Sequence, residues 1–167
     1  CEYPRGGINS RNQTSFKLKA GEHMAVLGRV GSGKSTIAKL ALGLFEATDG
    51  EIRVDGVDIR QLDPREYRGA VGYIPQDVTL FTGSLRDNIA LARPAITDAQ
   101  LIKAVERDGI ADWVNRHPLG FEMPISEWGE SVSGGQRKCI AVARGLVTEP
   151  SILIMEEHTG GNEQSTE

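Results

Sequence analysis

Residues 28–35 read Gly-Arg-Val-Gly-Ser-Gly-Lys-Ser, which matches the pattern G-x-x-x-x-G-K-[ST]. A short and mostly apolar run, residues 23–27, precedes the pattern and is typical of a buried strand. Over residues 37–44, apolar side chains follow at the i, i+3, i+4, i+7 spacing of an amphipathic helix. A strand, a glycine-rich turn and a helix in this order predict a loop whose backbone N–H groups and helix end surround a phosphate.

The glycines, the lysine and the hydroxyls of this loop each have a predicted task. Glycines let consecutive N–H groups turn inward, Lys34 would reach the β- and γ-phosphates, and the Ser35 hydroxyl would bind Mg²⁺. Thr36 would donate to the α-phosphate. The expected phosphate-binding residues are Gly28, Gly31, Ser32, Gly33, Lys34, Ser35 and Thr36. A loop that only makes a tight turn is the competing interpretation, but a turn requires neither the lysine nor the hydroxyl.

The rest of the pattern predicts an α/β fold with a mostly parallel sheet, because short apolar runs alternate with amphipathic helices. We expect strands at residues 16–20, 23–27, 70–74 and 152–155. A small β element is expected around Gly56, a helical insert over about residues 84–130, and a further helix over residues 139–146.

The expected helical insert carries its own start and stop signals. Thr97 and Gln100 have the spacing of a capping box ahead of an apolar helix face. Gly109 and Pro118 are residues that break helices, and together with the capping box they predict a helical insert.

A second helix start has the residues of an anion site. Ser133, Gly134, Gly135 and Gln136 precede the helix expected over residues 139–146. A serine and two glycines at a helix start would bind an anion. A nucleotide would then be closed between the loop of one copy and this cluster of another, so the cluster favours a dimer. A plain N-cap without any ligand is an equally supported alternative.

Two carboxylates follow the last expected strand. A phosphate loop needs a carboxylate at the end of a neighbouring strand to hold its metal, and Glu156 and Glu157 directly follow residues 152–155. Glu156 would hold Mg²⁺ directly or through water, and Glu157 would polarise the attacking water. The alternative is that two acids merely end a strand at the surface.

Taken together, these segments resemble the nucleotide-binding domain of an ABC transporter, with the family's order and spacing. The segments that carry the likeness are residues 28–35, 73–77, 133–136 and 152–157. The flanking segments further resemble exporter ATPases of type I secretion systems, at residues 28–33, 85–91 and 115–120. The resemblance implies a P-loop NTPase core over residues 1–167, truncated at both ends.

The resemblance also implies ATP and Mg²⁺ as ligands and assigns further roles. Tyr3 would stack on adenine, Gln76 would contact Mg²⁺ and water, and Glu157 would act as general base toward the attacking water. The implied metal ligands are Ser35, Gln76 and Glu156. An ordinary surface tyrosine is the alternative interpretation of Tyr3.

The partners and the location are likewise implied by the resemblance. They are a second nucleotide-binding domain, a transmembrane domain that this chain lacks, and membrane-fusion and outer-membrane proteins in the parent system. The domain would work at the cytoplasmic face of the inner membrane. There it would couple ATP hydrolysis to export, and the likeness to type I systems favours a protein or peptide as the exported substrate.

Three departures from the family pattern lie around Glu157. Glu156 stands where the family has Asp, His158 where it has Pro, and residues 160–163 replace a small-residue turn with an Asp. Glutamate is one methylene longer, and Mg²⁺ requires near-octahedral geometry, so the carboxylate must retract or act through water. The alternative function is therefore a degenerate subunit that binds nucleotide without hydrolysing it. A P-loop kinase or GTPase is disfavoured because neither requires the cluster at residues 133–136.

Charge and composition exclude several other classes. Lys and Arg number 19 against 23 Asp and Glu, a formal charge of −4, and basic residues do not cluster with aromatic ones, so nucleic acid is not an expected partner. Cys1 and Cys139 have no metal-ligand or redox spacing. No apolar run approaches the ~20 residues that span a bilayer, so the chain itself is expected to be soluble.

Overall fold

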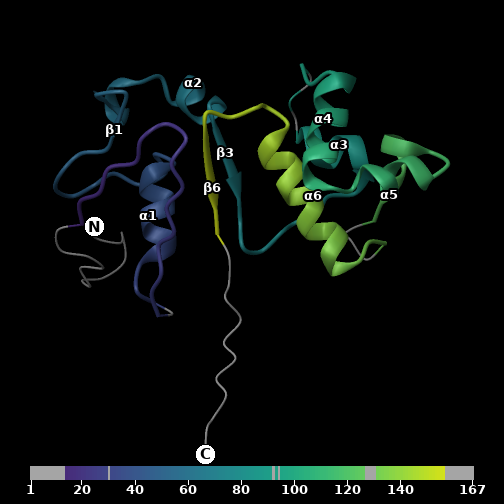
Figure 1. Ribbon diagram of the computed structural model, residues 1–167, viewed down its shortest axis with the longest axis horizontal. Helices are drawn as coiled ribbons and strands as arrows, with labels where there is room; N and C mark the ends of the chain where they lie inside the picture. The colour runs from purple at the N-terminus through teal and green to yellow at the C-terminus, as the bar shows by residue number, and fades with distance from the viewer. Residues whose placement is uncertain (1–13, 30, 92, 94, 127–130, 157–167) are drawn as a thin grey trace, which may run out of the picture. The chain divides into compact units, whose positions relative to one another are not determined.

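The computed structural model describes residues 14–29, 31–91, 93, 95–126 and 131–156 (Figure 1). The chain divides into two compact units, Cys1–Arg68 and Gly69–Glu167, and each is described by itself. Among the described residues, no helix is both long enough and apolar enough to cross a bilayer.

The first unit contains a helix directly after the glycine-rich loop and a small hairpin after that helix. Its elements are α1 (Lys34–Ala41), β1 (Arg53–Val54), β2 (Val57–Asp58), the 3-10 turn η1 (Ile59–Gln61) and α2 (Pro64–Gly69). β1 and β2 are antiparallel, and Asp55 and Gly56 turn the chain between them with positive φ angles of 51° and 83°. The helix after the loop and the exposed β element are thus confirmed, although α1 ends before Leu44, which is exposed.

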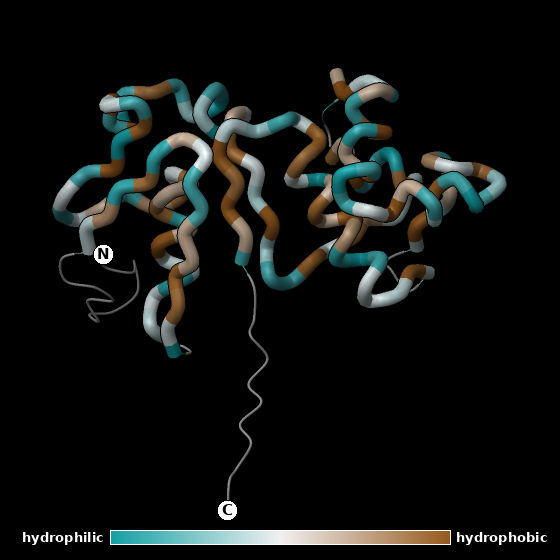
Figure 2. The backbone as a smooth tube through the Cα atoms, in the orientation of Figure 1, coloured by the Kyte–Doolittle hydropathy of each residue, from teal (hydrophilic) through white to brown (hydrophobic). Residues whose placement is uncertain are grey.

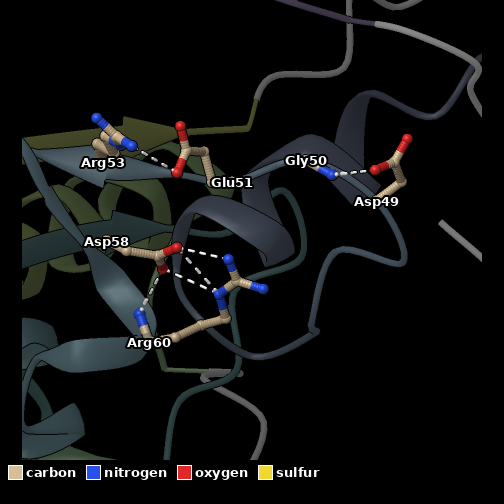
Figure 3. Close-up of polar contacts among 6 residues, drawn as sticks. All are labelled: Asp49, Gly50, Glu51, Arg53, Asp58 and Arg60. Atoms are coloured by element: carbon tan, nitrogen blue, oxygen red, sulfur yellow. Dashed lines mark hydrogen bonds and ion pairs between the residues drawn. The ribbon is translucent and has the colours of Figure 1, made fainter.

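An ion pair fixes the end of this hairpin. Arg60 donates from Nη2 to Asp58 Oδ2 at 2.5 Å and from Nε to Oδ1 and Oδ2 at 3.0 and 3.1 Å (Figure 3). The backbone N–H of Arg60 also donates to Asp58 Oδ1 at 2.9 Å, so Asp58 is the N-cap of η1. These bonds lower the pKa of Asp58 to about 2, which keeps its carboxylate charged.

Two side chains of α2 close the C-terminal end of α1. The Tyr67 hydroxyl donates to the backbone oxygen of Ala41, and Arg68 Nη2 donates to the backbone oxygen of Gly43 at 3.2 Å. The last carbonyls of a helix have no partner inside it. These bonds satisfy carbonyls at that end and attach α2 to the helix that leaves the glycine-rich loop.

The strands predicted at residues 16–20 and 23–27 are wrong for this structure. Both segments are irregular, a turn at Gly21 joins them, and no described strand pairs with either of them. Leu27 is 82% exposed. An apolar run has the composition of a buried strand, but a strand forms only where a neighbour takes its backbone N–H and C=O groups.

The second unit joins a parallel strand pair to a helical body. Its elements are β3 (Val71–Ile74), β4 (Gly83–Ser84), α3 (Leu85–Ala90), α4 (Asp98–Asp108), α5 (Ala111–Arg116), η2 (Gly120–Glu122), β5 (Pro124–Ile125), α6 (Gly134–Leu146) and β6 (Ile152–Met155). β3 and β6 lie side by side, with Val71 opposite Ile152 and Ile74 opposite Met155 (Figure 1). β4 and β5 form a small antiparallel pair. This mixture confirms the predicted α/β class.

The strand expected at residues 152–155 is present, but it is only partly buried. Figure 2 shows β6 as a continuous hydrophobic run, yet Leu153 is 44% and Met155 is 54% exposed. Among the described residues β6 pairs with β3 alone. Hydrophobicity predicts the strand, whereas burial depends on the layers that cover it.

Helix α6 packs against β3 so closely that there is no room for a side chain at Gly72 or Gly145. A Cβ atom on Gly72 would lie 2.3 Å from the backbone oxygen of Gly145, and one on Gly145 would lie 2.7 Å from Ile74 Cγ1. Neither distance is tolerable for a real Cβ, so this approach requires glycine on both elements.

Helices α3, α4 and α5 of the helical insert pack with α6 around one apolar cluster. Its fully buried side chains include Leu85, Ile89, Leu101 and Ile140. The predicted capping box is confirmed, since the Thr97 N–H donates to Gln100 Oε1 at 3.0 Å and the Gln100 N–H donates to Thr97 Oγ1 at 3.3 Å. Gly109, with φ of 80°, ends α4, and α5 ends before Pro118, as predicted.

A carboxylic acid lies in the interface between α4 and α6. Asp108 ends α4, its Oδ2 atom is buried without a hydrogen-bond partner among the described residues, and its carboxyl is hydrogen-bonded to the Cys139 thiol of α6. Burial raises the pKa of Asp108 to about 6, and the bond with Cys139 partly opposes this rise. Burial, followed by the neighbouring carboxyl, raises the pKa of the Cys139 thiol.

We predict that Asp108 makes stability fall as the pH rises. Its pKa in the folded chain exceeds the unfolded value of about 4, so between about pH 4 and about pH 6 the folded state holds a proton that the unfolded state has lost. The free energy of unfolding therefore decreases across this window and is constant above it. Asp108→Asn should raise the midpoint of thermal unfolding, followed by far-ultraviolet circular dichroism, above about pH 7, and this gain should vanish near pH 4. An equal effect at both pH values would contradict the assignment.

Candidate functional site

The glycine-rich loop has the backbone that a phosphate cradle requires. Gly31 and Gly33 have φ angles of 77° and 89°, in the left-handed region that favours glycine. A Cβ atom on Gly28 would lie 2.5 Å from Ser32 Oγ, so the start of the loop also has no room for a side chain. The Ser32 N–H donates to the Arg29 oxygen at 3.1 Å, which closes the turn. Three predicted glycines are therefore each explained by local geometry.

Lys34 lies over this loop. Its Nζ donates to the backbone oxygens of Gly28 and Arg29 at 2.6 and 3.1 Å. An ammonium group has three donors, so it can keep contacts with the loop and still reach a phosphate oxygen. The structure therefore places this ammonium group at the loop, and its contact with the β- and γ-phosphates stays a prediction.

The two hydroxyls that follow Lys34 differ in accessibility. Ser35 is exposed at the first turn of α1, where a metal-bound phosphate would lie, whereas Thr36 is only 5% exposed. Gly33 is the N-cap of α1 and no side chain caps it, so its first N–H groups are available to an anion. The roles of Ser35 toward Mg²⁺ and of Thr36 toward the α-phosphate stay predictions.

In the second unit, Gln76 and Glu156 lie at one end of the parallel strand pair. Gln76 is two residues beyond β3 and is exposed. Glu156 is one residue beyond β6, and its N–H donates to the Ile74 oxygen at 2.9 Å. The carboxyl ends of parallel strands are where α/β proteins bind ligands. The structure therefore brings these two predicted site residues to the same edge.

The Glu156 carboxylate has an oxygen that no described residue uses. Its Oε1 atom is buried and has no hydrogen-bond partner among the described residues. The register places Tyr73 opposite Ile154, so the side chains of Tyr73 and Glu156 lie on the same face of the strand pair. Burial, followed by the charge of the neighbouring Glu156 carboxylate, raises the pKa of Tyr73. The carboxylate therefore lies close to the phenol, and its Oε1 atom has no described partner.

This donor set fits Mg²⁺. Mg²⁺ is usually held by one or two carboxylates together with phosphate oxygens and waters, not by an all-protein cage. The described residues contain no group of three His, Cys, Asp or Glu side chains that could hold a metal, and Glu156 supplies one unpartnered hard oxygen. Glu156 and Gln76 would therefore supply only part of such a shell. The role of Ser35 toward Mg²⁺, in the other unit, stays a prediction.

The cluster at residues 133–136 caps its own helix. The Gln136 N–H donates to Ser133 Oγ at 3.2 Å, and the Ser133 N–H donates to Gln136 Oε1 at 2.8 Å. The N-cap interpretation is thus confirmed, and it is compatible with anion binding. Gly134 and Gly135 are exposed in the first turn of the 13-residue α6, where helix N–H groups have no partner within the helix.

Several predicted roles fall on residues outside the described part of the chain. Tyr3, the expected adenine contact, and Glu157, the expected general base, are among them. His158 and residues 160–163, which depart from the family pattern, lie there as well. Their roles stay predictions.

Two residues that the sequence reasoning missed hold the segment that carries Gln76. Asn88 is 1% exposed and stands between Leu85 and Ile89 on one face of α3. A polar side chain within an apolar helix face signals a buried hydrogen-bonding role, so Asn88 was detectable. Arg144 on α6 is the other, and no pattern in the sequence distinguishes it.

Comparisons with known proteins agree with this geometry. The sequence model of the ABC transporter family matches residues 11–160. A multidrug efflux ATP-binding/permease protein of Mycobacterium bovis is 41% identical over 147 residues, which are 88% of this chain and 12% of that protein. The exotoxin translocation ATP-binding protein PaxB of Pasteurella aerogenes is 38% identical over 156 residues, which are 93% of this chain and 22% of that protein.

A solved structure of a bacterial Atm1-family ABC exporter with ATP bound is similar in three dimensions as well. It has 37% sequence identity and a TM-score of 0.70, and the match covers 77% of this chain and 23% of that one. The chain spans only 12% to 28% of the length of such relatives.

We predict that Lys34→Ala weakens the binding of ATP to the chain by about 10- to 100-fold, because a hydrogen bond from a charged group contributes ~1.5–3 kcal/mol. Lys39, in the last turn of the same helix, lies over the Phe45 ring at 5.7 Å and makes the matched control. Lys39→Ala should bind ATP as the unchanged chain does. Titration calorimetry measures both, and undiminished binding by Lys34→Ala would overturn the assignment of the loop.

Proposed function

Because the chain belongs to the ABC transporter family, as the ATPase domain of an exporter, we propose that it binds Mg²⁺-ATP and hydrolyses it to drive export across a membrane. The single observation that carries this proposal is the loop at residues 28–35, where Lys34 bonds the backbone of Gly28 and Arg29, and Gly31 and Gly33 turn the chain into the start of α1. The similar Atm1-family exporter has ATP bound, which supports the choice of nucleotide. That residues 1–167 form one ATP-binding domain is part of the proposal.

The proposed chemistry assigns a task to each site residue. Lys34 and the loop amides hold the triphosphate, and bound Mg²⁺ would neutralise charge on the β- and γ-phosphate oxygens. Glu156 and Gln76 orient the reacting groups from the end of the strand pair. Glu157 accepts a proton from the water that attacks the γ-phosphorus, while the bond from that phosphorus to the bridging oxygen breaks and ADP leaves. Tyr3 would stack on the adenine ring.

The proposal includes partners. A second nucleotide-binding domain would present its own Ser133 helix start to the γ-phosphate, because exposed N–H groups at that end of α6 attract an anion. A transmembrane domain, fused or separate, would receive the motion of the helical insert, and the relatives that carry ATP-binding and permease parts together support this. The site would then work at the cytoplasmic face of the inner membrane.

Glu156 is the residue that decides between hydrolysis and nucleotide binding alone. Its buried and unpartnered Oε1 supports a working metal ligand despite the extra methylene. The second candidate function, a degenerate subunit that binds without turnover, is supported by the replacement of the family's Asp at this position. A ligand displaced by about 1 Å can cost about 10²-fold in rate, so the two functions differ measurably.

We predict that the full-length exporter releases phosphate from Mg²⁺-ATP, and that Glu157→Gln abolishes release while ATP binding persists. A second variant, Glu156→Asp, shortens the side chain at the metal position. Its control is Glu106→Asp, which shortens a glutamate on the exposed face of α4 and should leave phosphate release unchanged. A colorimetric phosphate assay measures release. If the unchanged protein binds ATP without releasing phosphate, and Glu156→Asp restores release, the degenerate subunit is the correct function.

For the exported substrate we propose a protein or peptide, as in type I secretion. The segments at residues 85–91 and 115–120 and the 38% identity with an exotoxin translocation protein support this choice. Small-molecule efflux is the second candidate, supported by the 41% identity with a multidrug efflux protein.

The two substrate classes can be separated in cells that carry the Lys34→Ala allele. We expect a protein to disappear from the culture medium while efflux of ethidium continues at the rate of unmodified cells. Mass spectrometry of the medium and ethidium fluorescence are the two measurements. An unchanged set of secreted proteins together with slower ethidium efflux would assign the exporter to small molecules.

A further inference from the structure

The segment that carries Gln76, residues 75–82, is attached at its far end by one buried amide. Asn88 Nδ2 donates to the backbone oxygens of Phe81 and Ser84 at 2.8 and 3.0 Å. Asn88 Oδ1 accepts from the Phe81 N–H at 2.9 Å. Two bonds from a single side chain therefore fix Phe81 to α3, and the third is made to Ser84, the N-cap of the same helix.

Arg144 attaches the same segment to α6. Its Nε donates to the backbone oxygen of Asn88 at 2.8 Å, and its Nη1 donates to the backbone oxygen of Thr79 at 3.2 Å. The guanidinium is largely enclosed, which lowers the pKa of Arg144 from its ordinary value, and its Nη2 atom is buried without an acceptor among the described residues. Burying a charged group costs free energy unless hydrogen bonds compensate for the lost water. The Arg144 guanidinium is therefore held where it makes its two bonds to backbone oxygens.

The near end of the segment is attached to α6 as well. Ile74, two residues before Gln76, packs so closely against α6 that position 145 must be glycine. Gly72 packs against the backbone of the same Gly145. Gln76 therefore lies between two points fixed to α6, Ile74 through Gly145 and Thr79 through the adjacent Arg144. Within this unit, the segment is thus attached to α6 on both sides of Gln76.

We propose that Arg144 is a positioning residue for ATP hydrolysis, and that it makes the Gln76 segment move as one body with α6. This inference rests on the proposed function, because it gives the segment a reaction to serve. Ser133 is the N-cap of α6. The Arg144 hydrogen bonds therefore connect the helix whose start is expected to contact a partner's nucleotide with the segment that carries Gln76. Gln76 is the residue expected to contact the domain's own metal and water. Coupling between two sites requires such a physical link.

The first test needs no nucleotide. Amide hydrogen exchange is followed by mass spectrometry in the full-length protein and in Arg144→Met, which keeps the length of the apolar stem but removes both donors. We expect exchange over residues 76–82 to accelerate about tenfold or more, while exchange over β6 is unchanged. Arg107→Met, on the exposed face of α4, is the matched control and should leave residues 76–82 unaltered. Unchanged exchange over residues 76–82 in Arg144→Met would overturn the proposal.

The second test is a double-mutant cycle on phosphate release. Arg144→Met should lower kcat about tenfold with an unchanged KM for ATP, because the nucleotide is held mainly by the loop at residues 28–35. If Arg144 acts through Gln76, Gln76→Ala combined with Arg144→Met should be no slower than Gln76→Ala alone. If instead the double variant loses kcat by the product of the two single losses, the proposal is overturned.

Two further outcomes keep this result separate from unfolding and from failure of the proposed function. Arg144→Lys keeps the charge but replaces the two donor nitrogens of the guanidinium with one, so it should give intermediate exchange and intermediate kcat; a value equal to that of Arg144→Met would overturn the role of the directed bonds. A protein that hydrolyses no ATP, but whose Arg144→Met variant still exchanges faster over residues 76–82, would separate the two claims. In that case Arg144 does hold the segment, and the proposed function is wrong.

Discussion

The backbone contact between α6 and β3 is the constraint on which the second unit depends. Gly72 and Gly145 let helix and strand approach closer than any side chain allows. This contact aligns the strand pair β3 and β6 with the helix that begins at Ser133. β3 and α6 therefore pack directly against each other, and close-packed protein interiors transmit strain.

In the proposed function, backbone groups, more than side chains, would form the sites for negative charge. The loop at residues 28–35 and the start of α6 both offer N–H groups at a helix end, and only the loop adds a lysine. A single helix end contributes ~0.3–1 kcal/mol, up to ~2 when partly buried, so neither holds a nucleotide by itself. A chain with net charge −4 can bind a triphosphate because its donors are local and directed.

Much of the candidate site could be predicted from the sequence because it depends on local geometry. The positive φ angles of Gly31 and Gly33, the capping box of Ser133 with Gln136, and the place of Glu156 after a strand each follow from a few neighbouring residues. Asn88 and Arg144 were missed because their partners are backbone carbonyls of other segments. Carbonyls are present at every residue, so no sequence pattern identifies such bonds.

The sequence by itself determined the helices, their caps and the phosphate loop, since hydrogen bonds between near neighbours and steric limits at glycine decide these features. Only the tertiary structure decided which apolar runs become buried strands. Residues 23–27 and 152–155 have similar composition, yet the second pairs with β3 and the first pairs with no described strand. The physical reason is that a strand completes its hydrogen bonds with a distant segment, whereas a helix completes them within itself.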